Sequence, residues 1–278
     1  MKSIKYFLAL GLFITGLTSC EKEPPTQDEI EAKWPAAITT IEAGDFVLVK
    51  RSADGFTMGD AFLATSSPEH LVKLSKSYYM CKTEVTQAQW KAIMGTNPSD
   101  NEGIIASGTN TDNCPVNNIS QNDAKDFIEA LNAATGRKYA LPTEAQWEWA
   151  AMGGNLSAGN MFSGSNDMNE VAWTALNSDG YLNEVGKLKA NELGIYDMTG
   201  NVEEWTADRY SEYNEAEATD PTGATSGANY VTRGGHFYDS DADILSIRAR
   251  NKNKNSDKKY TRGLRLVILE PLSTELSK

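Results

Sequence analysis

Three short helices begin with the same local pattern, which constrains the fold more than any other feature of this sequence. The pattern is a Ser or Thr followed three residues later by Gln or Asp, and it occurs at residues 86–89, 120–123 and 143–146. In such a capping box, the hydroxyl and the later side chain satisfy free backbone N–H groups at a helix start. Glycines follow each helix at a natural stopping distance, at Gly95, Gly136 and Gly153-Gly154. The sequence therefore predicts three helices of limited length.

The rest of the chain predicts short strands separated by loops rich in Gly, Asn and Asp. The expected strands are residues 46–50, 71–79, 229–233 and 263–269. No break suited to a domain boundary follows Ile41, and no tandem repeat is present. We expect an α+β fold: one compact domain over residues 42–271 with short strands, three or more short helices and much irregular loop.

The N-terminal residues predict export and a lipid anchor. Lys2 and Lys5 precede an apolar run at residues 6–17, which is too short for a comfortable membrane span and is typical of a signal peptide. The run ends in Leu-Thr-Ser-Cys, which resembles the bacterial lipobox. We therefore expect residues 1–19 to be removed and Cys20 to be lipidated. A plain secretory signal with an incidental cysteine is the alternative.

The segment after the anchor is charged and contains prolines. Residues 20–41 have this composition, as in a flexible tether, and residues 272–278 form a tail. Glutamates at positions 21 and 23 favour the outer membrane, on its periplasmic face or at the cell surface. The formal net charge of −12 argues against nucleic acid as a partner, because phosphate binding needs a basic face.

Several long motifs stand in a fixed order along the chain. They are YMCKTEVT at residues 79–86, CPVNNIS at 114–120, LPTEAQWEWAA at 141–151, NELGIYDMTGNVEEW at 191–205, RGG at 233–235 and GLR at 263–265. This series resembles the formylglycine-generating enzymes, the sulfatase-modifying factor family, over about residues 42–269. The resemblance implies a C-type-lectin-like fold. It also implies an activity, the oxidation of a sulfatase cysteine with oxygen and copper, although the family includes noncatalytic lipoproteins.

The sequence departs from the enzymes at the catalytic cysteine pair. The two positions after the RGG segment fall on about Asp239 and near Ile244, and no cysteine follows Cys114. Copper(I) is a soft ion that takes thiolates, and carboxylates hold it poorly. We therefore expect no copper and no standard formylglycine-generating activity. The iron-dependent relatives need a histidine-rich site, whereas this chain has only His70 and His236.

The resemblance also implies calcium sites. In residues 197–204, Asp197 and Glu204 would give side-chain oxygens, and Gly200 and Val202 would give carbonyl oxygens. A glycine turn with solvated carboxylates is the alternative. A second calcium site would use Asn169 and Asp179, although the spacing between them is shorter than in the enzymes. An ordinary polar loop explains that segment equally well.

Three further groups of residues have two interpretations each. Asp239, Asp241 and Asp243 alternate, so on an extended strand they would share one face and could bind a cation or a basic partner, or form a solvated acidic edge. His236 could line the old catalytic cleft or have a structural role. Cys81 and Cys114 could form a disulfide, since export allows one, or remain buried thiols.

Three functions remain open from the sequence. The first is a binding or accessory module in the cell envelope, which would hold a protein or glycan ligand in the former peptide groove. The second is an unconventional oxidase acting on sulfatase cysteines, for which tight copper binding would be diagnostic. The third is a structural component of an envelope complex, such as a gliding or secretion apparatus.

We predict that Cys20 carries the lipid. Cells given a radioactive lipid precursor should label the wild-type protein, whereas Cys20→Ala should take up no label because the variant lacks the thiol that is acylated. Gel autoradiography after immunoprecipitation measures the label, with Cys114→Ala as a matched control that should label normally. Label on the Cys20→Ala variant would contradict the lipobox interpretation.

Overall fold

The structure is a computed structural model that describes residues 45–269. Within these residues, no helix is long and apolar enough to cross a membrane. The predicted signal peptide, Cys20, the tether up to residue 41 and the tail from residue 272 lie outside the described residues.

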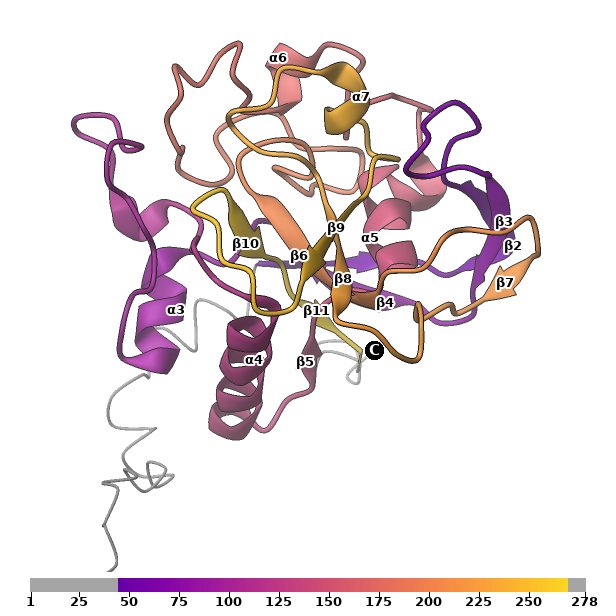
Figure 1. Cartoon of the computed structure of the whole chain (residues 1–278), viewed down its shortest axis with the longest axis horizontal. Helices are drawn as coiled ribbons and strands as arrows, with labels where there is room; N and C mark the ends of the chain where they lie inside the picture. Colours follow the sequence, from indigo (N-terminus) through magenta and orange to yellow (C-terminus); the bar gives the residue numbers. More distant parts are fainter. Residues whose placement is uncertain (1–44, 270–278) are drawn as a thin grey trace, which may run out of the picture.

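Within residues 45–269, eleven short strands form three small sheets, and Figure 1 shows them in the expected α+β arrangement. The first sheet has the order β1-β4-β11-β5, from Phe46–Val49, Tyr78–Cys81, Val267–Ile268 and Tyr139–Ala140. The second has the order β10-β6-β8-β9, from Arg262–Leu264, Glu203–Arg209, Asn229–Arg233 and Asn251–Lys254. The third has the order β2-β3-β7, from Ser52–Met58, His70–Leu74 and Ala218–Thr219. The first strand, β1, and the last, β11, both pair with β4, so the two ends of the described chain lie in the same sheet.

All three predicted helices are confirmed together with their capping boxes. They are α3 (Gln87–Met94), α4 (Gln121–Thr135) and α5 (Glu144–Ala151). Gly95 and Gly136 end the first two with φ angles of 72° and 68°, in the left-handed region that favours glycine. α5 ends at Ala151, just before the predicted glycine pair. Two one-turn helices, α6 (Met168–Val171) and α7 (Ala242–Leu245), lie in the loop-rich part of the domain.

Two of the predicted strands are wrong as single strands. Residues 71–79 divide into β3 and β4, which belong to different sheets, and residues 263–269 divide into β10 and β11. In the second case, Arg265 lies between the two strands with its side chain completely buried against Glu204. The chain therefore changes sheet at a buried ion pair, which a pattern of apolar residues does not reveal.

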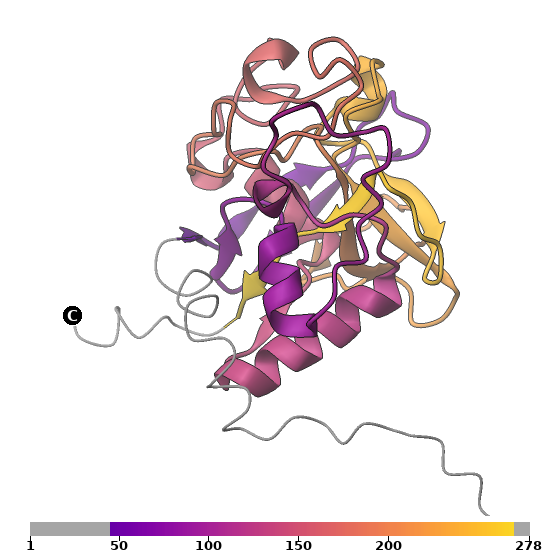
Figure 2. The ribbon, with the colours of Figure 1, turned by 90° about the vertical axis from the view of Figure 1, so that its left-hand side faces the viewer.

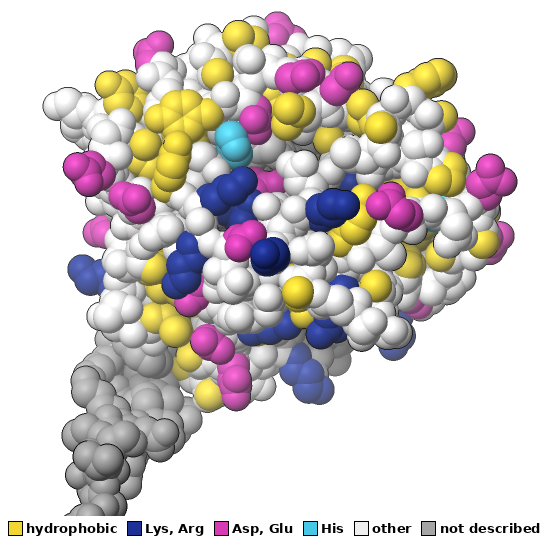
Figure 3. All heavy atoms as spheres, in the orientation of Figure 1, with side chains coloured by type: hydrophobic (Ala, Val, Ile, Leu, Met, Phe, Trp, Pro, Cys, Tyr) yellow, Lys and Arg dark blue, Asp and Glu magenta, His cyan; other side chains and the backbone are white. Residues whose placement is uncertain are grey.

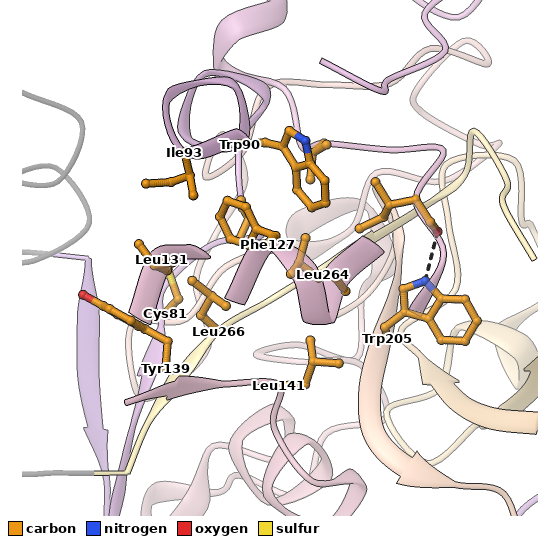
Figure 4. Close-up of a cluster of buried hydrophobic side chains, with 14 of the residues drawn as sticks. Cys81, Trp90, Ile93, Phe127, Leu131, Tyr139, Leu141, Trp205, Leu264 and Leu266 are labelled. Carbon is orange, nitrogen blue, oxygen red and sulfur yellow. Dashed lines mark hydrogen bonds between the residues drawn. The ribbon is translucent and has the colours of Figure 1, made fainter. Parts of the chain in front are cut away.

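One hydrophobic cluster lies between helices α3 and α4 and the strands beneath them (Figure 4). Trp90 and Phe127 stack with their ring centroids 4.7 Å apart, and Leu264 and Leu266 pack in the same cluster. Trp205 also belongs to it, and its indole N–H donates a hydrogen bond to the carbonyl of Ile119 at 3.0 Å. Figure 2 shows the two helices together on the face turned to the viewer. Each fully buried aromatic ring of this kind stabilises the fold by roughly 1.5–3 kcal/mol.

A second part of the core contains buried charges. Glu144 and Glu148 lie one turn apart on α5 and are held by arginines from the C-terminal half of the chain. Arg233 donates to both glutamates, and Arg250 donates to both oxygens of Glu144 at 2.7 Å. The charges therefore compensate one another in a region from which water is excluded.

Asp208, at the edge of this network, has a carboxyl that binds its proton unusually tightly. It is buried on β6, and its Oδ2 accepts a hydrogen bond from the backbone N–H of Glu144 at 2.9 Å. Burial, followed by the negative charge of Glu144, raises the pKa of Asp208 to about 7. The folded protein therefore holds a proton that the unfolded chain releases near pH 4.

We predict that Asp208 makes stability depend on pH. Because its pKa is higher in the folded state, its contribution is complete below about pH 4 and is lost as pH rises through about 7. Relative to Asp208→Asn, the unfolding free energy of the wild type should therefore fall by about 4 kcal/mol from about pH 4 to about pH 8. Urea denaturation at several pH values measures it. Exposed Asp54→Asn is the control and should follow the wild type, whereas parallel wild-type and Asp208→Asn curves would contradict the prediction.

Candidate functional site

The two positions expected to replace the catalytic cysteines come together beside Gly235. A Cβ atom placed on Gly235 would lie 3.2 Å from Oδ2 of Asp239 and 3.5 Å from the carbonyl oxygen of Ile244. Gly235 has a φ of 67°, so the chain turns sharply at this point. The structure therefore places both substituted positions at one site, above the end of β8.

Asp239 uses its carboxylate to hold a tight turn. Its backbone N–H donates to the carbonyl of His236 at 2.9 Å, and its Oδ2 accepts from the backbone N–H of His236, also at 2.9 Å. The same oxygen lies 3.3 Å from Nδ1 of His236. Burial lowers the pKa of His236, while the neighbouring charges of Asp239 and Glu203 oppose that effect. The imidazole is thus mostly neutral near pH 7, and its observed contacts are within the turn.

The prediction that Asp239, Asp241 and Asp243 share one face of a strand is wrong. Asp239 ends the turn, and Asp241 caps α7 by accepting a hydrogen bond from the backbone N–H of Asp243 at 2.9 Å. Aspartate readily bonds to backbone N–H groups two residues further on, which favours turns and helix starts over extended strand. The alternation therefore reflects local capping, and the three carboxylates do not form one acidic face.

The predicted calcium loop folds into a turn with three residues in the left-handed region. Asp197, Gly200 and Asn201 have φ angles of 57°, 79° and 55°. A side chain on Gly200 would place its Cβ 2.2 Å from the carbonyl oxygen of Trp173, so this position accepts only glycine. Val202 follows in the core, and Glu204 lies on β6. The loop thus brings Asp197 and Glu204 into the same buried region.

Asp197 meets a carboxylate that sequence reasoning did not assign. Its Oδ2 accepts from the backbone N–H of Gly186 at 2.6 Å, whereas its Oδ1 is buried and has no hydrogen-bond partner in the described structure. Glu84 is also completely buried, and its Oε1 likewise lacks a partner. Burial raises the pKa of Asp197 to about 6, and burial together with the charge of Asp197 raises that of Glu84.

Glu204 differs from Asp197 because its oxygens are already engaged. Arg265 donates to both oxygens, with its Nη2 at 2.8 Å from Oε1, and the indole N–H of Trp147 donates to Oε2 at 2.7 Å. Arg265 binds Glu204 directly, and its charge lowers the pKa values of Glu84 and Asp197 against the larger effect of burial. The region between residues 45 and 269 contains no group of three or more His, Cys, Asp or Glu side chains arranged to hold a metal. A cation here would therefore depend on backbone carbonyls and water as well as carboxylates.

In the described residues, no hydrogen bond joins Asn169 to Asp179 and no disulfide joins the two cysteines. Asn169 is exposed on α6, and Asp179 is exposed in a turn with a φ of 54°, and the hydrogen bonds of Asn169 stay within its own helix start. Cys81 and Cys114 are both free and buried, in different hydrophobic clusters. Burial raises the pKa of Cys81 to about 11 and that of Cys114 to about 12, so both thiols are protonated near neutral pH.

Sequence reasoning missed Glu84 as a member of the site, although it lies inside one of the long motifs. The sequence contained one signal, because Glu84 stands directly before Val85 near the end of the motif at residues 79–86, where burial is expected. A buried acid in such a place needs a hydrogen-bond donor, a proton or a cation. Its closeness to Asp197, more than a hundred residues later in the chain, could be learned only from the fold.

Comparison with known proteins shows the family. A model of the sulfatase-modifying factor enzyme 1-like domain matches residues 25–269, and so begins within the predicted tether. Chaperone protein LppX of Paenibacillus barcinonensis is 32% identical over 232 residues, covering 65% of this chain and 77% of that protein. The formylglycine-generating enzyme of Streptomyces coelicolor is 28% identical over 247 residues, covering 82% of this chain and 75% of the enzyme.

Solved structures agree on the fold. Treponema denticola variable protein 1 is similar with a TM-score of 0.75 and 27% identity, covering 81% of this chain and 95% of that chain. PvdO from Pseudomonas aeruginosa has a TM-score of 0.67 at 23% identity and covers 81% of this chain and 94% of its own. The fold is therefore the single-domain, C-type-lectin-like α+β fold that the motifs implied. With the match over residues 25–269, this chain belongs to the family of sulfatase-modifying factor enzyme 1-like domains.

Proposed function

We propose that this protein is an exported lipoprotein that acts as a binding or accessory module for another protein in the cell envelope, without copper oxidase activity. The observation that carries the proposal is the site beside Gly235, where Asp239 and Ile244 stand at the expected cysteine positions. The carboxylate of Asp239 is engaged by the backbone of its own turn. Copper(I) chemistry needs thiolates, which neither side chain supplies.

The remaining cysteines do not offer a substitute. Cys81 and Cys114 are buried in separate clusters, and burial keeps both thiols protonated. A thiolate is the form that binds a metal and attacks a substrate. The name of one relative, Chaperone protein LppX of Paenibacillus barcinonensis, supports an accessory role.

We also propose that the buried carboxylates of Asp197 and Glu84 hold a calcium ion. Two orphaned carboxylate oxygens lie in one buried region, where the positive charge of Arg265 balances only part of the negative charge. Burying charge without compensation is costly, so the cluster must take up protons or a cation. Hard carboxylate oxygens suit calcium, and the carbonyls of Gly200 and Val202 would complete its ligands, with Glu204 serving mainly to hold Arg265.

The proposed loss of copper chemistry predicts that the protein lacks oxidase activity. A soluble form beginning at Glu21, incubated with copper, a reductant and a peptide bearing the Cys-x-Pro-x-Arg sulfatase motif, should give no formylglycine above a copper-only control. Mass spectrometry of the peptide detects the conversion. The enzyme from Streptomyces coelicolor is the positive control, and near-ultraviolet circular dichroism shows that the tested protein is folded. Conversion by the folded protein, or tight copper binding, would contradict the proposal and favour the unconventional oxidase.

The second prediction concerns calcium. Saturating calcium should raise the melting temperature of the wild type by several degrees, because a ligand at about 100 times its Kd adds about 2.7 kcal/mol. Glu84→Gln should lose most of this shift, since an amide oxygen is a weaker calcium ligand than a carboxylate. Glu129→Gln, an exposed residue of α4, is the matched control and should keep it. No shift in the wild type, with no calcium in elemental analysis, would contradict the site.

A further inference from the structure

Arg262 is a buried guanidinium whose two amino groups have no partner. The residue begins β10 and is 0% exposed, and its Nε donates to Oε2 of Glu203 at 2.7 Å. Nη1 and Nη2 are both buried, and neither has a hydrogen-bond partner in the described structure. Four N–H donors are thus unsatisfied on one side chain, and each buried donor left unpaired costs roughly 1–3 kcal/mol. Nη1 and Nη2 of Arg262 therefore need a hydrogen-bond acceptor.

Both oxygens of Glu203, the ion-pair partner of Arg262, are already engaged. Glu203 has its other oxygen occupied by Thr232, whose hydroxyl donates at 2.6 Å, and by Asn251, whose amide donates at 2.9 Å. On the opposite side, the guanidinium carbon of Arg262 lies 4.7 Å from the centre of the Trp205 ring. Arg262 is therefore fixed in orientation by an ion pair and an aromatic ring, with its amino edge left over.

The loop that carries Arg262 contacts the turn at the expected catalytic-cysteine positions. Tyr238 in this turn lies with its ring centroid 6.0 Å from that of Tyr260, and the backbone N–H of Arg262 donates to the carbonyl of Lys259 at 3.0 Å in the same loop. Lys259 is exposed, and His236 is half-buried. Two segments far apart in sequence, the turn at residues 236–239 and the loop at 259–262, thus form one charged site.

Exposed aromatic rings join these two segments at the surface. Tyr238 is 42% exposed and Tyr260 is 43% exposed, and their rings meet edge to face with centroids 6.0 Å apart. Tyr238 packs against Gly180, where an added Cβ would lie 3.2 Å from its ring. Figure 3 shows hydrophobic side chains beside a histidine, with basic side chains immediately adjoining them. A ligand at this place would meet aromatic surface and positive charge together.

We propose that Arg262 and Lys259 bind a single carboxylate of a partner protein, an Asp or Glu side chain, with Tyr238 and Tyr260 contacting the carbon chain that carries it. The planar guanidinium edge matches the two oxygens of a carboxylate. The charges of Arg262 and Lys259 are balanced by those of Glu203 and Asp239, so the site favours a monoanion over a dianion such as phosphate. The amino groups are covered in this structure, so binding requires the exposed side chains near them to move aside.

This assignment rests on the proposed binding function and names the group that is recognised. It makes no use of the calcium cluster, which involves different residues. Failure of the carboxylate site would leave partner capture from membranes as an independent test of the binding function. Conversely, conversion of a sulfatase peptide would overturn the proposed function without changing the binding of a carboxylate probe.

The test is a titration monitored by nuclear magnetic resonance of the isotope-labelled soluble domain. The probe is acetyl-glutamyl amide, which carries one carboxylate, and its neutral match is acetyl-glutaminyl amide. The glutamyl probe should shift the Nε–H signal of Arg262 and the backbone signals of His236 and Tyr260 in a saturable manner. The neutral probe should bind at least 10-fold more weakly, since a charge-assisted bidentate contact is lost. Inorganic phosphate should bind more weakly than the glutamyl probe.

Variants separate the site from general charge. Lys259→Gln should weaken the glutamyl probe about 3-fold, while Lys91→Gln, an exposed lysine of α3, should leave binding unchanged. Arg262→Gln combined with Glu203→Gln removes both buried charges and should weaken binding at least 10-fold. If that pair does not fold, Arg262→Lys keeps the ion pair but loses the fork and should weaken binding similarly.

Three results would overturn the inference. They are equal binding of the charged and neutral probes, equal effects of Lys91→Gln and Lys259→Gln, and phosphate binding stronger than that of the glutamyl probe. The first would mean that the aromatic rings alone bind the probe, and the second would indicate attraction without a site. The third would indicate an adventitious ion only, or a site for a dianion, either of which excludes the carboxylate assignment.

Discussion

Buried pairs between arginine and glutamate hold this fold in one arrangement. Within residues 45–269, Arg233, Arg262 and Arg265 lie completely away from solvent, each bound to a glutamate from a distant segment. The strands are too short to define their own partners by long ladders, since several contain only two to four residues. Breaking a buried pair by removing one partner costs roughly 3–5 kcal/mol. The pairs therefore add little net stability. Their main effect is that any arrangement that separates the paired segments leaves a buried charge unpaired and is strongly disfavoured.

The long sequence motifs supply all four glutamates of these pairs and two of the arginines, Arg233 and Arg265. The segment at residues 141–151 supplies Glu144 and Glu148 on one face of α5, and the RGG segment supplies Arg233 between them. Adjacent residues on β6, Glu203 and Glu204, point to opposite faces of their strand. Each accordingly finds a different arginine, one on β10 and one just after it. The motifs are long because a buried charge needs both a partner of opposite charge and a backbone that places the two side chains together.

Local interactions made the helices predictable, and long-range ones made the site difficult. The capping boxes at Thr86, Ser120 and Thr143 involve residues three apart, so the sequence alone contains all of their geometry. The strand predicted from the alternating aspartates near α7 was wrong, because Asp241 instead caps the start of that helix. The family motifs placed Asp197 and Glu204 in one region, but the partners that decide their chemistry, Glu84 and Arg265, come from other segments. Periodicity and spacing do not encode which buried charge faces which.

The expected catalytic positions lie apart from the buried charge pairs that fix the fold. Neither Asp239 nor Ile244 takes part in the buried pairs or in the two largest hydrophobic clusters. The carboxylate of Asp239 bonds within its own turn, and Ile244 is 43% exposed on a one-turn helix. Substitution there changes the chemistry at little cost to stability. Arg262 has the opposite character, because its Nε belongs to the frame while its amino edge is left unpaired beside that turn. A side chain that the fold holds in place, but whose hydrogen-bond donors it leaves unpaired, can bind a new ligand without a change of fold.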